Sequence, residues 1–143
     1  MVSFEVLPTS FQSGWANIIH MSIGNDHGRY GDRTPGVWFQ PSSSSATTKK
    51  LTIYSAVNGY PNYRYDSTKM FPLNTWIRVK IEQADENGKA TFRVYLDDEE
   101  VHEMINTQPR DFDNVKVYVS DPWYPPQAGK IRNLLIINRV ASP

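Results

Sequence analysis

Residues 24–33 form a short polar segment between two predicted strands, where oxygen ligands, glycines and cations are gathered in ten positions. Calcium ions in proteins are held by about six to eight oxygen atoms from carboxylates, amide side chains and backbone carbonyls. Asn25, Asp26 and Asp32 supply such oxygens and are candidate calcium ligands, although the segment lacks the spaced pattern of an EF-hand. The alternative is a glycine-rich turn in which Asp32 pairs with Arg33 or accepts backbone N–H bonds.

Residues 120–126 form a second candidate loop, in which prolines stiffen a segment that carries two adjacent aromatic side chains. A fixed ring suits sugar recognition because it covers the apolar C–H face of a pyranose with little loss of entropy. Asp121 could bond to sugar hydroxyls or join a metal site with the first loop. Alternatively, Trp123 and Tyr124 fold inward while Asp121 caps the turn. The side chains of both loops that we expect to contact a ligand are His27, Tyr30, Arg33, Asp121, Trp123 and Tyr124.

A third group of candidate residues lies between positions 54 and 65, where tyrosines are interspersed with asparagine and arginine. On one face of a sheet these side chains would form a groove for a saccharide or a peptide. Pairs of tyrosines across neighbouring strands explain the same residues without a ligand, and both interpretations stay open at this point. The residues concerned are Tyr54, Asn58, Tyr60, Asn62, Tyr63, Arg64 and Tyr65.

The acidic residues and histidines form no recognisable catalytic pattern. Glycoside hydrolysis uses two carboxyl groups about 5–10 Å apart, but the densest acidic run, residues 97–100, falls at a predicted turn. His20, His27 and His102 lack metal-ligand spacing, and no nucleophile motif such as G-x-S-x-G is present. The sequence therefore predicts a protein that is not an enzyme, with a glycan-active hydrolase as an alternative.

The composition excludes several classes of partner. The chain has 143 residues, enough for one domain with a core, and 15 basic residues balance 15 acidic ones. A neutral chain without a basic run is a poor match for nucleic acid or an anionic membrane surface. The absence of cysteine excludes disulfides and thiolate metal sites. No apolar stretch reaches the ~18 residues of a membrane span, and the sequence begins without the pattern of a signal peptide.

Alternation of apolar and polar residues predicts the strands that must position these side chains. The alternation is clearest in residues 76–84, 90–96 and 115–119. The other β-rich segments, bounded by Pro, Gly, Asn or Ser, are residues 4–7, 16–23, 37–40, 51–57 and 63–65. The last segment, residues 131–138, is apolar on both faces, and we therefore expect a central strand that is covered on both sides.

The turns between the clearest strands predict a meander over residues 76–105. Asn87-Gly88 is a strong hairpin signal, and Asp97-Asp98 indicates the next tight turn. A helical turn within residues 98–105 competes with the third strand, because Val101, Met104 and Ile105 have helical spacing.

Three stretches combine tryptophans, glycines and turn residues in a distinctive order. They are Gly14-Trp15 running into residues 31–38, Leu73-Asn74-Thr75-Trp76 running into Val94-Tyr95-Leu96-Asp97, and residues 114–125 running into residues 129–134. Together they resemble the concanavalin A-like lectin/glucanase superfamily, and within it a laminin-G-like domain that recurs in invertebrate extracellular proteins. The resemblance covers about residues 3–138. It implies a two-sheet antiparallel jelly-roll sandwich and, as in related domains, a rim calcium held by Asp or Asn.

The sequence thus predicts a single all-β sandwich domain over residues 1–143. Its expected function is that of an extracellular, lectin-like module that binds a glycan or glycoprotein, with calcium as a candidate cofactor. Because a single sugar site binds weakly, oligomerisation is a natural way to raise the affinity. The main alternative is a structural or adhesion domain that binds other extracellular proteins; nucleic acid and membrane insertion are not expected.

Overall fold

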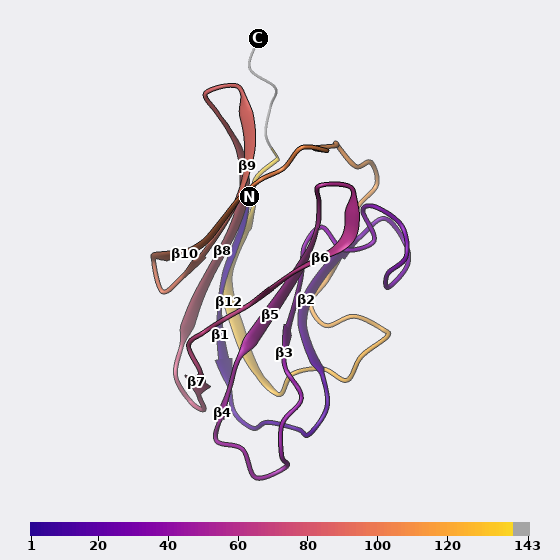
Figure 1. Cartoon of the computed structure of the whole chain (residues 1–143). Helices are drawn as coiled ribbons and strands as arrows, with labels where there is room; N and C mark the ends of the chain where they lie inside the picture. Colours follow the sequence, from indigo (N-terminus) through magenta and orange to yellow (C-terminus); the bar gives the residue numbers. More distant parts are fainter. Residues whose placement is uncertain (139–143) are drawn as a thin grey trace.

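Two antiparallel β-sheets face each other and form the body of the molecule (Figure 1). The computed structural model describes residues 1–138. Sheet A has the strand order β10-β9-β8-β1-β12. Its strands are β1 Val2–Pro8, β8 Ile77–Glu86, β9 Lys89–Leu96, β10 Glu99–Ile105 and β12 Gly129–Ile136. Among residues 1–138, no helix is long and apolar enough to cross a membrane.

Sheet B covers sheet A with five more strands in the order β11-β2-β3-β5-β6. Its strands are β2 Ala16–Ser22, β3 Gly36–Phe39, β5 Leu51–Val57, β6 Tyr60–Asp66 and β11 Lys116–Tyr118. A small pair, β4 Thr48–Lys49 with β7 Phe71–Pro72, lies at the lower end of the sandwich in Figure 1. The arrangement is an antiparallel jelly-roll sandwich, and the predicted fold class is confirmed.

The apolar faces of the alternating strands fill the space between the sheets. Sheet A contributes Val2, Phe4, Val6, Ile77, Val79, Ile81, Phe92, Val94 and Leu96, and sheet B contributes Val37, Phe39, Leu51, Ile53 and Val57. Each of these side chains is at most 4% exposed. Because full burial of such a side chain stabilises the fold by about 1.5–3 kcal/mol, this core holds the two sheets face to face.

Three tight hairpins set the register of neighbouring strands. Asn58-Gly59, Asn87-Gly88 and Asp97-Asp98 have positive φ angles at both turn positions. This turn conformation matches the right-handed twist of paired strands. The predicted meander of β8, β9 and β10 is therefore confirmed. The alternative of a helical turn in residues 98–105 is wrong, because β10 pairs with β9 along its length.

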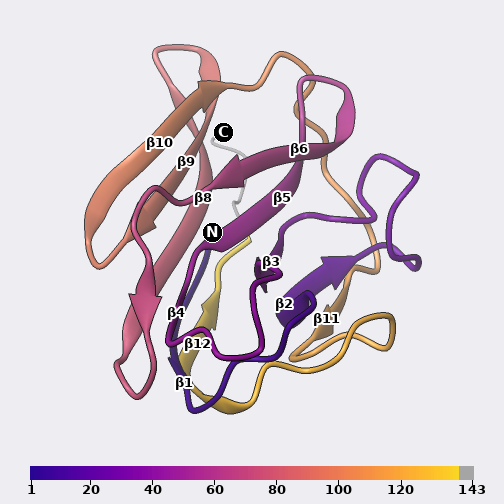
Figure 2. The same cartoon turned by 60° about the horizontal axis from the view of Figure 1, so that its bottom comes forward.

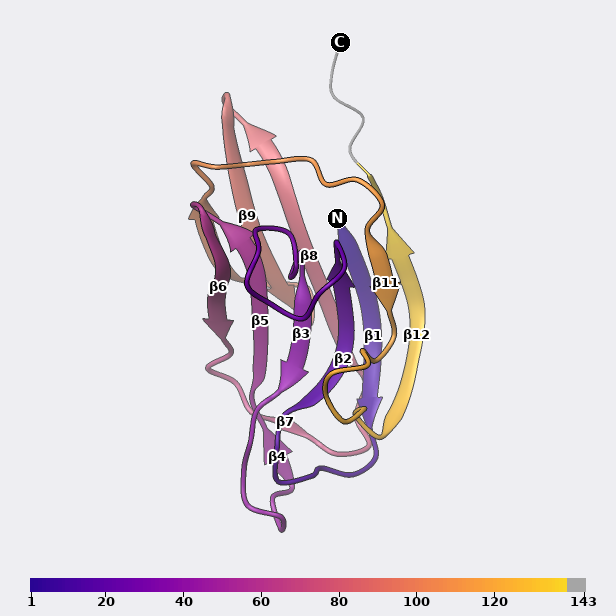
Figure 3. The ribbon, with the colours of Figure 1, turned by 90° about the vertical axis from the view of Figure 1, so that its right-hand side faces the viewer.

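The last strand is not the covered central strand that its sequence predicts. β1 already pairs with β8, so β12 has a neighbour on one edge only and ends sheet A. β11 ends sheet B, and Figure 3 shows both strands on the same side of the sandwich. The apolar side chains here are 39–50% exposed, and we call them the open edge: Val117, Val119, Leu134, Leu135 and Ile137. Apolar residues on both faces of a strand indicate that the strand is hydrophobic, but they do not indicate whether it pairs with one neighbouring strand or with two.

Candidate functional site

Strand register brings three large side chains together on the outer face of sheet B. Tyr54 of β5 is paired with Arg64 of β6 and with Gly36 of β3. Trp38 follows Gly36 by two residues and therefore points to the same face, because side chains alternate along a strand. The intervening Val37 is buried in the core. Trp38, Tyr54 and Arg64 thus project away from sheet A on three neighbouring strands.

Trp38 forms the base of an aromatic cluster and is only 1% exposed. Its six-membered ring lies over Gly36, where an added Cβ atom would overlap the ring. The rings of His20, Tyr54 and Tyr124 meet it edge-on, with centroid distances of 5.2–5.5 Å. The indole Nε1 is buried and has no hydrogen-bond partner among residues 1–138. An unsatisfied buried donor costs about 1–3 kcal/mol.

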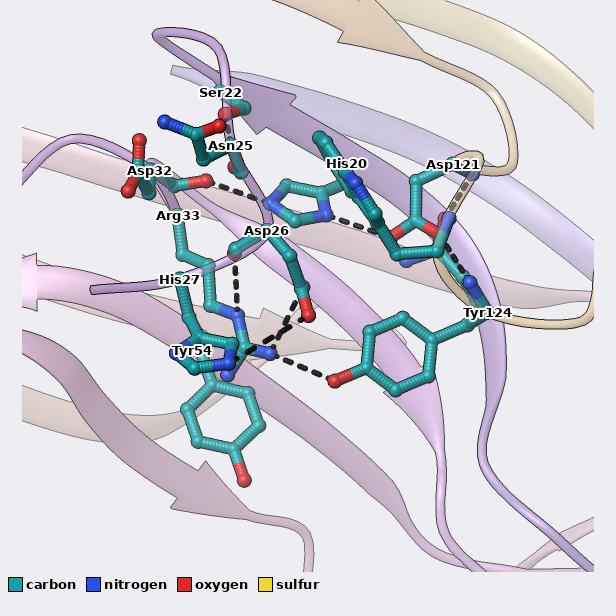
Figure 4. Close-up of polar contacts among 12 residues, drawn as sticks. His20, Ser22, Asn25, Asp26, His27, Asp32, Arg33, Tyr54, Asp121 and Tyr124 are labelled. Atoms are coloured by element: carbon teal, nitrogen blue, oxygen red, sulfur yellow. Dashed lines mark hydrogen bonds and ion pairs between the residues drawn. The ribbon is translucent and has the colours of Figure 1, made fainter. Parts of the chain in front are cut away.

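Arg33, from the first predicted loop, extends toward Tyr54 and Tyr124 (Figure 4). Its guanidinium carbon is 4.7 Å from the ring centroid of Trp38 and 4.4 Å from that of Tyr54, which is cation–π geometry. Asp26 holds the group, since Nη2 donates to Oδ1 at 3.2 Å and Nε donates to the backbone oxygen at 3.1 Å. Nη2 also donates to the hydroxyl of Tyr124 at 3.1 Å. Arg33 therefore joins the two predicted loops over the sheet.

His20 of β2 anchors both loops from below. Its Nε2 donates to the backbone oxygen of Asp32 at 2.7 Å, and its Nδ1 is hydrogen-bonded to Oδ2 of Asp121 at 2.7 Å. Both ring nitrogens therefore have an oxygen partner within the protein. Oδ1 of Asp121 accepts the backbone N–H groups of Trp123 at 3.0 Å and Tyr124 at 2.9 Å. The His20 and Asp121 side chains have no exposed surface, and we call this buried pair the His20–Asp121 clasp.

Arg64 provides a second guanidinium group beside the cluster. Its Nε donates to both carboxylate oxygens of Asp66, at 2.9 and 3.1 Å, and its Nη1 donates to the hydroxyl of Tyr54 at 3.2 Å. The guanidinium carbon lies 5.3 Å from the ring centroid of Trp15. Burial raises the pKa of Asp66, but hydrogen bonds from Thr52 and Arg64 outweigh burial and bring the pKa below its usual 3.8. The bond to Asp66 in turn raises the pKa of Arg64.

Together these side chains form a pocket of about 250 Å³, which we call the sheet B pocket. It is lined by Trp15, Arg33, Trp38, Tyr54, Arg64 and Tyr124. Figures 1 and 2 show the loops that contain Arg33 and Tyr124 on the outer side of sheet B. Arg33 and Tyr124 come from these loops, whereas Trp38, Tyr54 and Arg64 come from strands. The rigid sheet therefore positions three of the six lining residues.

A larger hollow of about 360 Å³ lies on the outer face of sheet A. Its lining residues are Ser3, Phe4, Glu5, Arg78, Val79, Lys80, Tyr95, Asp98 and Asn133. Arg78 is bonded there to Glu5 at 3.8 Å and to Asp98 at 2.5 Å. Because these charged groups already satisfy one another and no stacked rings line the hollow, the smaller sheet B pocket is the better candidate site.

The other predicted contact residues lie around the pocket and do not line it. Trp123 is 38% exposed and packs edge-on against His20 and Tyr118. Tyr30 turns away, and its hydroxyl donates to the backbone oxygen of Gln108 at 2.7 Å. His27 is exposed beside Asp26. Asp121 is buried in the clasp and caps its turn, as the alternative interpretation of this loop describes. A role for these residues in binding stays a prediction.

Two of the three predicted calcium ligands, Asp26 and Asp32, are bonded to arginine side chains, and a calcium role for the set stays a prediction. Asp26 is bonded to Arg33, whereas the carboxylate of Asp32 accepts the backbone N–H and the guanidinium of Arg29. Asn25 is exposed. Among residues 1–138, the histidine and acidic groups that converge are His20, Asp26 and Asp121, with ligand atoms within 4.8 Å of one another. In this cluster His20 and Asp121 already satisfy each other, and guanidinium groups occupy the carboxylates of Asp26 and Asp32.

Trp15 and Trp38 line the pocket, although sequence reasoning assigned neither to a site. Both lie in the stretch that carried the family resemblance, but a tryptophan in a strand is also typical of a core residue. The available signal was Gly36, two residues before Trp38 on the same strand face, where a missing side chain makes room for a large ring. Of the third predicted group, Tyr54 and Arg64 line the pocket. The remaining tyrosines are elsewhere: Tyr63 and Tyr65 stack on His102, and Tyr60 is exposed.

Comparison with known proteins adds little to this geometry. No model of a known protein family matches the sequence, and no curated protein matches it. One solved structure that matches is a native heptameric SAP-like pentraxin from Limulus polyphemus, with a TM-score of 0.45 and 16% sequence identity. The match covers 72% of this chain and 42% of the pentraxin chain, so the chain spans less than half of that protein's length. A likeness this distant assigns no residue and no ligand.

Proposed function

We propose that the protein is a non-catalytic, lectin-like module that binds a carbohydrate in the sheet B pocket. The observation that carries the proposal is the pocket's lining, in which four aromatic rings surround two arginine side chains. Aromatic rings stack on the C–H faces of sugars, and fixed guanidinium groups offer directional hydrogen bonds to sugar oxygens. The laminin-G-like resemblance and an extracellular location are parts of the same proposal.

The pocket is ordered by contacts within the protein. Arg33 is held by Asp26 and Tyr124, and Arg64 is held by Asp66 and Tyr54. Immobilising a long side chain on binding costs about 0.5–1.5 kcal/mol. Here both arginines are already immobilised in the folded protein, so ligand binding does not incur that cost. A small ligand can therefore bind with useful affinity in a pocket of this size.

The hydrolase alternative requires two carboxyl groups that flank the bound sugar. None of the described residues that line the sheet B pocket is an aspartate or a glutamate. Asp26 and Asp66, the carboxylates that contact the lining arginines, are each bonded to one of them. This arrangement supports binding in preference to hydrolysis.

Calcium has no necessary role in this proposal. An ion at Asp26 or Asp32 would have to displace the guanidinium groups of Arg33 and Arg29, and it would then lie beside two positive charges. We expect sugar binding to be equal with calcium and with EDTA. A thermal-shift measurement with each additive tests this, and stabilisation by calcium alone would restore a cofactor role for Asn25, Asp26 and Asp32.

A glycan array tests the proposed function, with the protein displayed in multivalent form because one site binds weakly. The matched variants are Trp15→Ala, which removes a ring of the pocket, and Trp76→Ala, which removes a similarly half-buried ring elsewhere. We expect Trp15→Ala to lose binding to the glycans that the parent protein recognises, and Trp76→Ala to keep it. Silence of the parent protein across the array would refute the proposal.

Protein binding is a second candidate function, favoured by the open edge. Its five aliphatic side chains are 39–50% exposed and lie in, or directly after, the two strands that end their sheets. Exposed apolar surface of this kind often marks a protein interface. A structural or adhesion domain, or an oligomer of this chain, would use the edge without any selectivity for sugars. Sedimentation of the parent protein and of Leu135→Lys tests for self-association, which would be weaker in the variant.

A further inference from the structure

We infer that the sheet B pocket binds its sugar through an oxyanion, a carboxylate or sulfate group that the sugar carries. The inference rests on the proposed function and names the class of sugar that the site accepts. Its basis is the count of hydrogen-bond donors and acceptors that the lining residues leave unused.

Both guanidinium groups keep a nitrogen for a ligand. Arg33 uses Nε and Nη2 for Asp26 and Tyr124. Arg64 uses Nε and Nη1 for Asp66 and Tyr54. Within residues 1–138, Nη1 of Arg33 and Nη2 of Arg64 have no hydrogen-bond partner, and each carries two N–H groups.

Trp38 and Tyr54 add two more donors to the lining. The indole nitrogen of Trp38 can only donate, and it is buried without a partner among residues 1–138. The hydroxyl oxygen of Tyr54 accepts from Arg64, which leaves its own hydrogen for a ligand. Four of the residues that line one pocket of about 250 Å³ therefore have an unused donor.

Acceptors are scarce in the same lining. None of its described residues is Asp, Glu, Asn or Gln, and the hydroxyl oxygens of Tyr54 and Tyr124 already accept from the arginines. A neutral sugar hydroxyl is both a donor and an acceptor, so its hydrogen would find no good partner here. A carboxylate or sulfate only accepts, and it therefore matches a lining that only donates.

The local charges favour the same ligand. Asp26 and Asp66 neutralise the two arginines, but neither carboxylate lines the pocket. An anion in the pocket would therefore meet the guanidinium N–H groups first. Hydrogen bonds between ionised partners are about twice as strong as neutral ones. The pocket is smaller than the ~300–1,000 Å³ typical of drug-sized ligand sites, so it suits one monosaccharide with its charged group.

NMR titration with matched sugar pairs tests the inference. The pairs are methyl glucoside with methyl glucuronide, and galactose with galactose 6-sulfate; sodium acetate and sodium sulfate test the ions alone. We expect a charged sugar to bind about tenfold more tightly than its neutral parent, since bonds to charged groups are the stronger ones. A preference in one pair only identifies the oxyanion as carboxylate or as sulfate.

The other outcomes separate this inference from the proposed function. Equal affinity for charged and neutral sugars would overturn the oxyanion and leave the carbohydrate function standing. An absence of binding by every sugar would overturn both. Binding of inorganic sulfate or acetate as tightly as the charged sugar would keep the oxyanion site and remove the sugar.

Arg64→Gln provides the matching variant, because this half-exposed residue contributes charge and little core packing. We expect about a tenfold loss of affinity for the charged sugar and a clearly smaller loss for its neutral parent, because the bond to the anion is the stronger one. Arg132→Gln is the control, since Arg132 also stacks on a tryptophan, 3.8 Å from the ring centroid of Trp76, but lies on sheet A. An equal loss in both variants would contradict a specific role for Arg64.

The indole N–H signal of Trp38 gives a readout that does not depend on affinity. The chain has four tryptophans and hence four indole signals, and Trp38→Phe identifies the one from Trp38. We expect the charged sugar to move this signal downfield, as a new acceptor reaches Nε1, while the Trp76 signal stays in place. A saturated complex in which the Trp38 signal is unmoved would contradict the donor count on which the inference rests.

Discussion

The sheet B pocket and the open edge both contain large apolar side chains, but only in the pocket do hydrogen-bonded polar side chains surround them. In the pocket, Arg33 lies over the rings of Trp38 and Tyr54 and is itself held by Asp26. At the open edge, aliphatic side chains such as Val119 are half exposed. The pocket combines stacking with directional hydrogen bonds, whereas the edge offers only hydrophobic contact, which has no direction.

The difference shows how this sandwich separates selective from unselective surface. A site that binds through hydrogen bonds needs its polar groups fixed in place. Loss of one of the contacts that fix them should therefore reduce both stability and binding. A hydrophobic edge needs no such fixed contacts, and a substitution there should change the free energy of unfolding of the isolated protein only slightly. The predictions below test this contrast, from the largest expected effect to the smallest.

Breaking the His20–Asp121 clasp should have the largest effect. Asp121→Ala leaves Nδ1 of the buried His20 without its partner and frees the backbone N–H groups of Trp123 and Tyr124. Three bonds to the carboxylate are lost, and each polar group left unpaired costs about 1–3 kcal/mol; urea denaturation would measure the sum, and sugar binding should be lost as well. Asp113→Ala, at an exposed acid in the preceding connection, is the control. A comparable loss in both variants would mean that the clasp does not order the loops.

A methyl group at position 36 should have a smaller but clear effect. Gly36→Ala places a Cβ atom where the ring of Trp38 lies, so the ring has to shift. Overpacking of this kind costs about 1–3 kcal/mol, and sugar binding should weaken because Trp38 forms the base of the pocket. Gly14→Ala is the matched control, since no atom lies within 4 Å of its added Cβ. A thermal melt of Gly36→Ala that coincides with that of Gly14→Ala would show that the ring is not fixed.

The sequence predicts those structural features that depend on residues close together in the chain. Alternating residues in β1, β8 and β9 face the core, and Asn87-Gly88 forms the expected hairpin turn. These features depend on neighbouring residues in the chain, so a single sequence contains them. The two loops at residues 24–33 and 120–126 were also predicted, and Arg33 and Tyr124 from them meet over sheet B.

The parts that the sequence does not predict depend on which strands become neighbours. Trp38, Tyr54 and Arg64 share a pocket because β3, β5 and β6 are adjacent with a particular register. The prediction for residues 131–138 was wrong for the same reason, because strand order and not composition leaves β12 at an edge. His20 was assigned no role, since its partners Asp32 and Asp121 are remote in sequence.

The pH dependence of stability should report on the ion pair between Asp66 and Arg64 beside the pocket. The pKa of Asp66 lies below its usual 3.8 in the folded protein, because Thr52 and Arg64 donate to the carboxylate and outweigh its burial. The ionised carboxylate therefore stabilises the fold above pH 3.8, and this contribution is lost as the pH falls through the lowered pKa. We expect Asp66→Asn to melt below the parent protein at pH 7, by a modest margin because the side chain is half exposed. The two melting temperatures should converge in acid, and a gap that persists there would rule out the ionised pair as its source.

The open edge should show the smallest effect, and a null result there is informative. Leu135 is 49% exposed and faces away from the core beside Ser3. Leu135→Ser should change the free energy of unfolding by less than about 0.5 kcal/mol, as is usual for exposed positions. Phe4→Ala, on the adjacent strand β1 but in the core, should cost about 3–5 kcal/mol. If Leu135→Ser instead costs more than about 1 kcal/mol in dilute protein, something covers the edge in solution. In that case a dependence of the loss on protein concentration would identify the cover as a second copy of the chain, because stability is then linked to association.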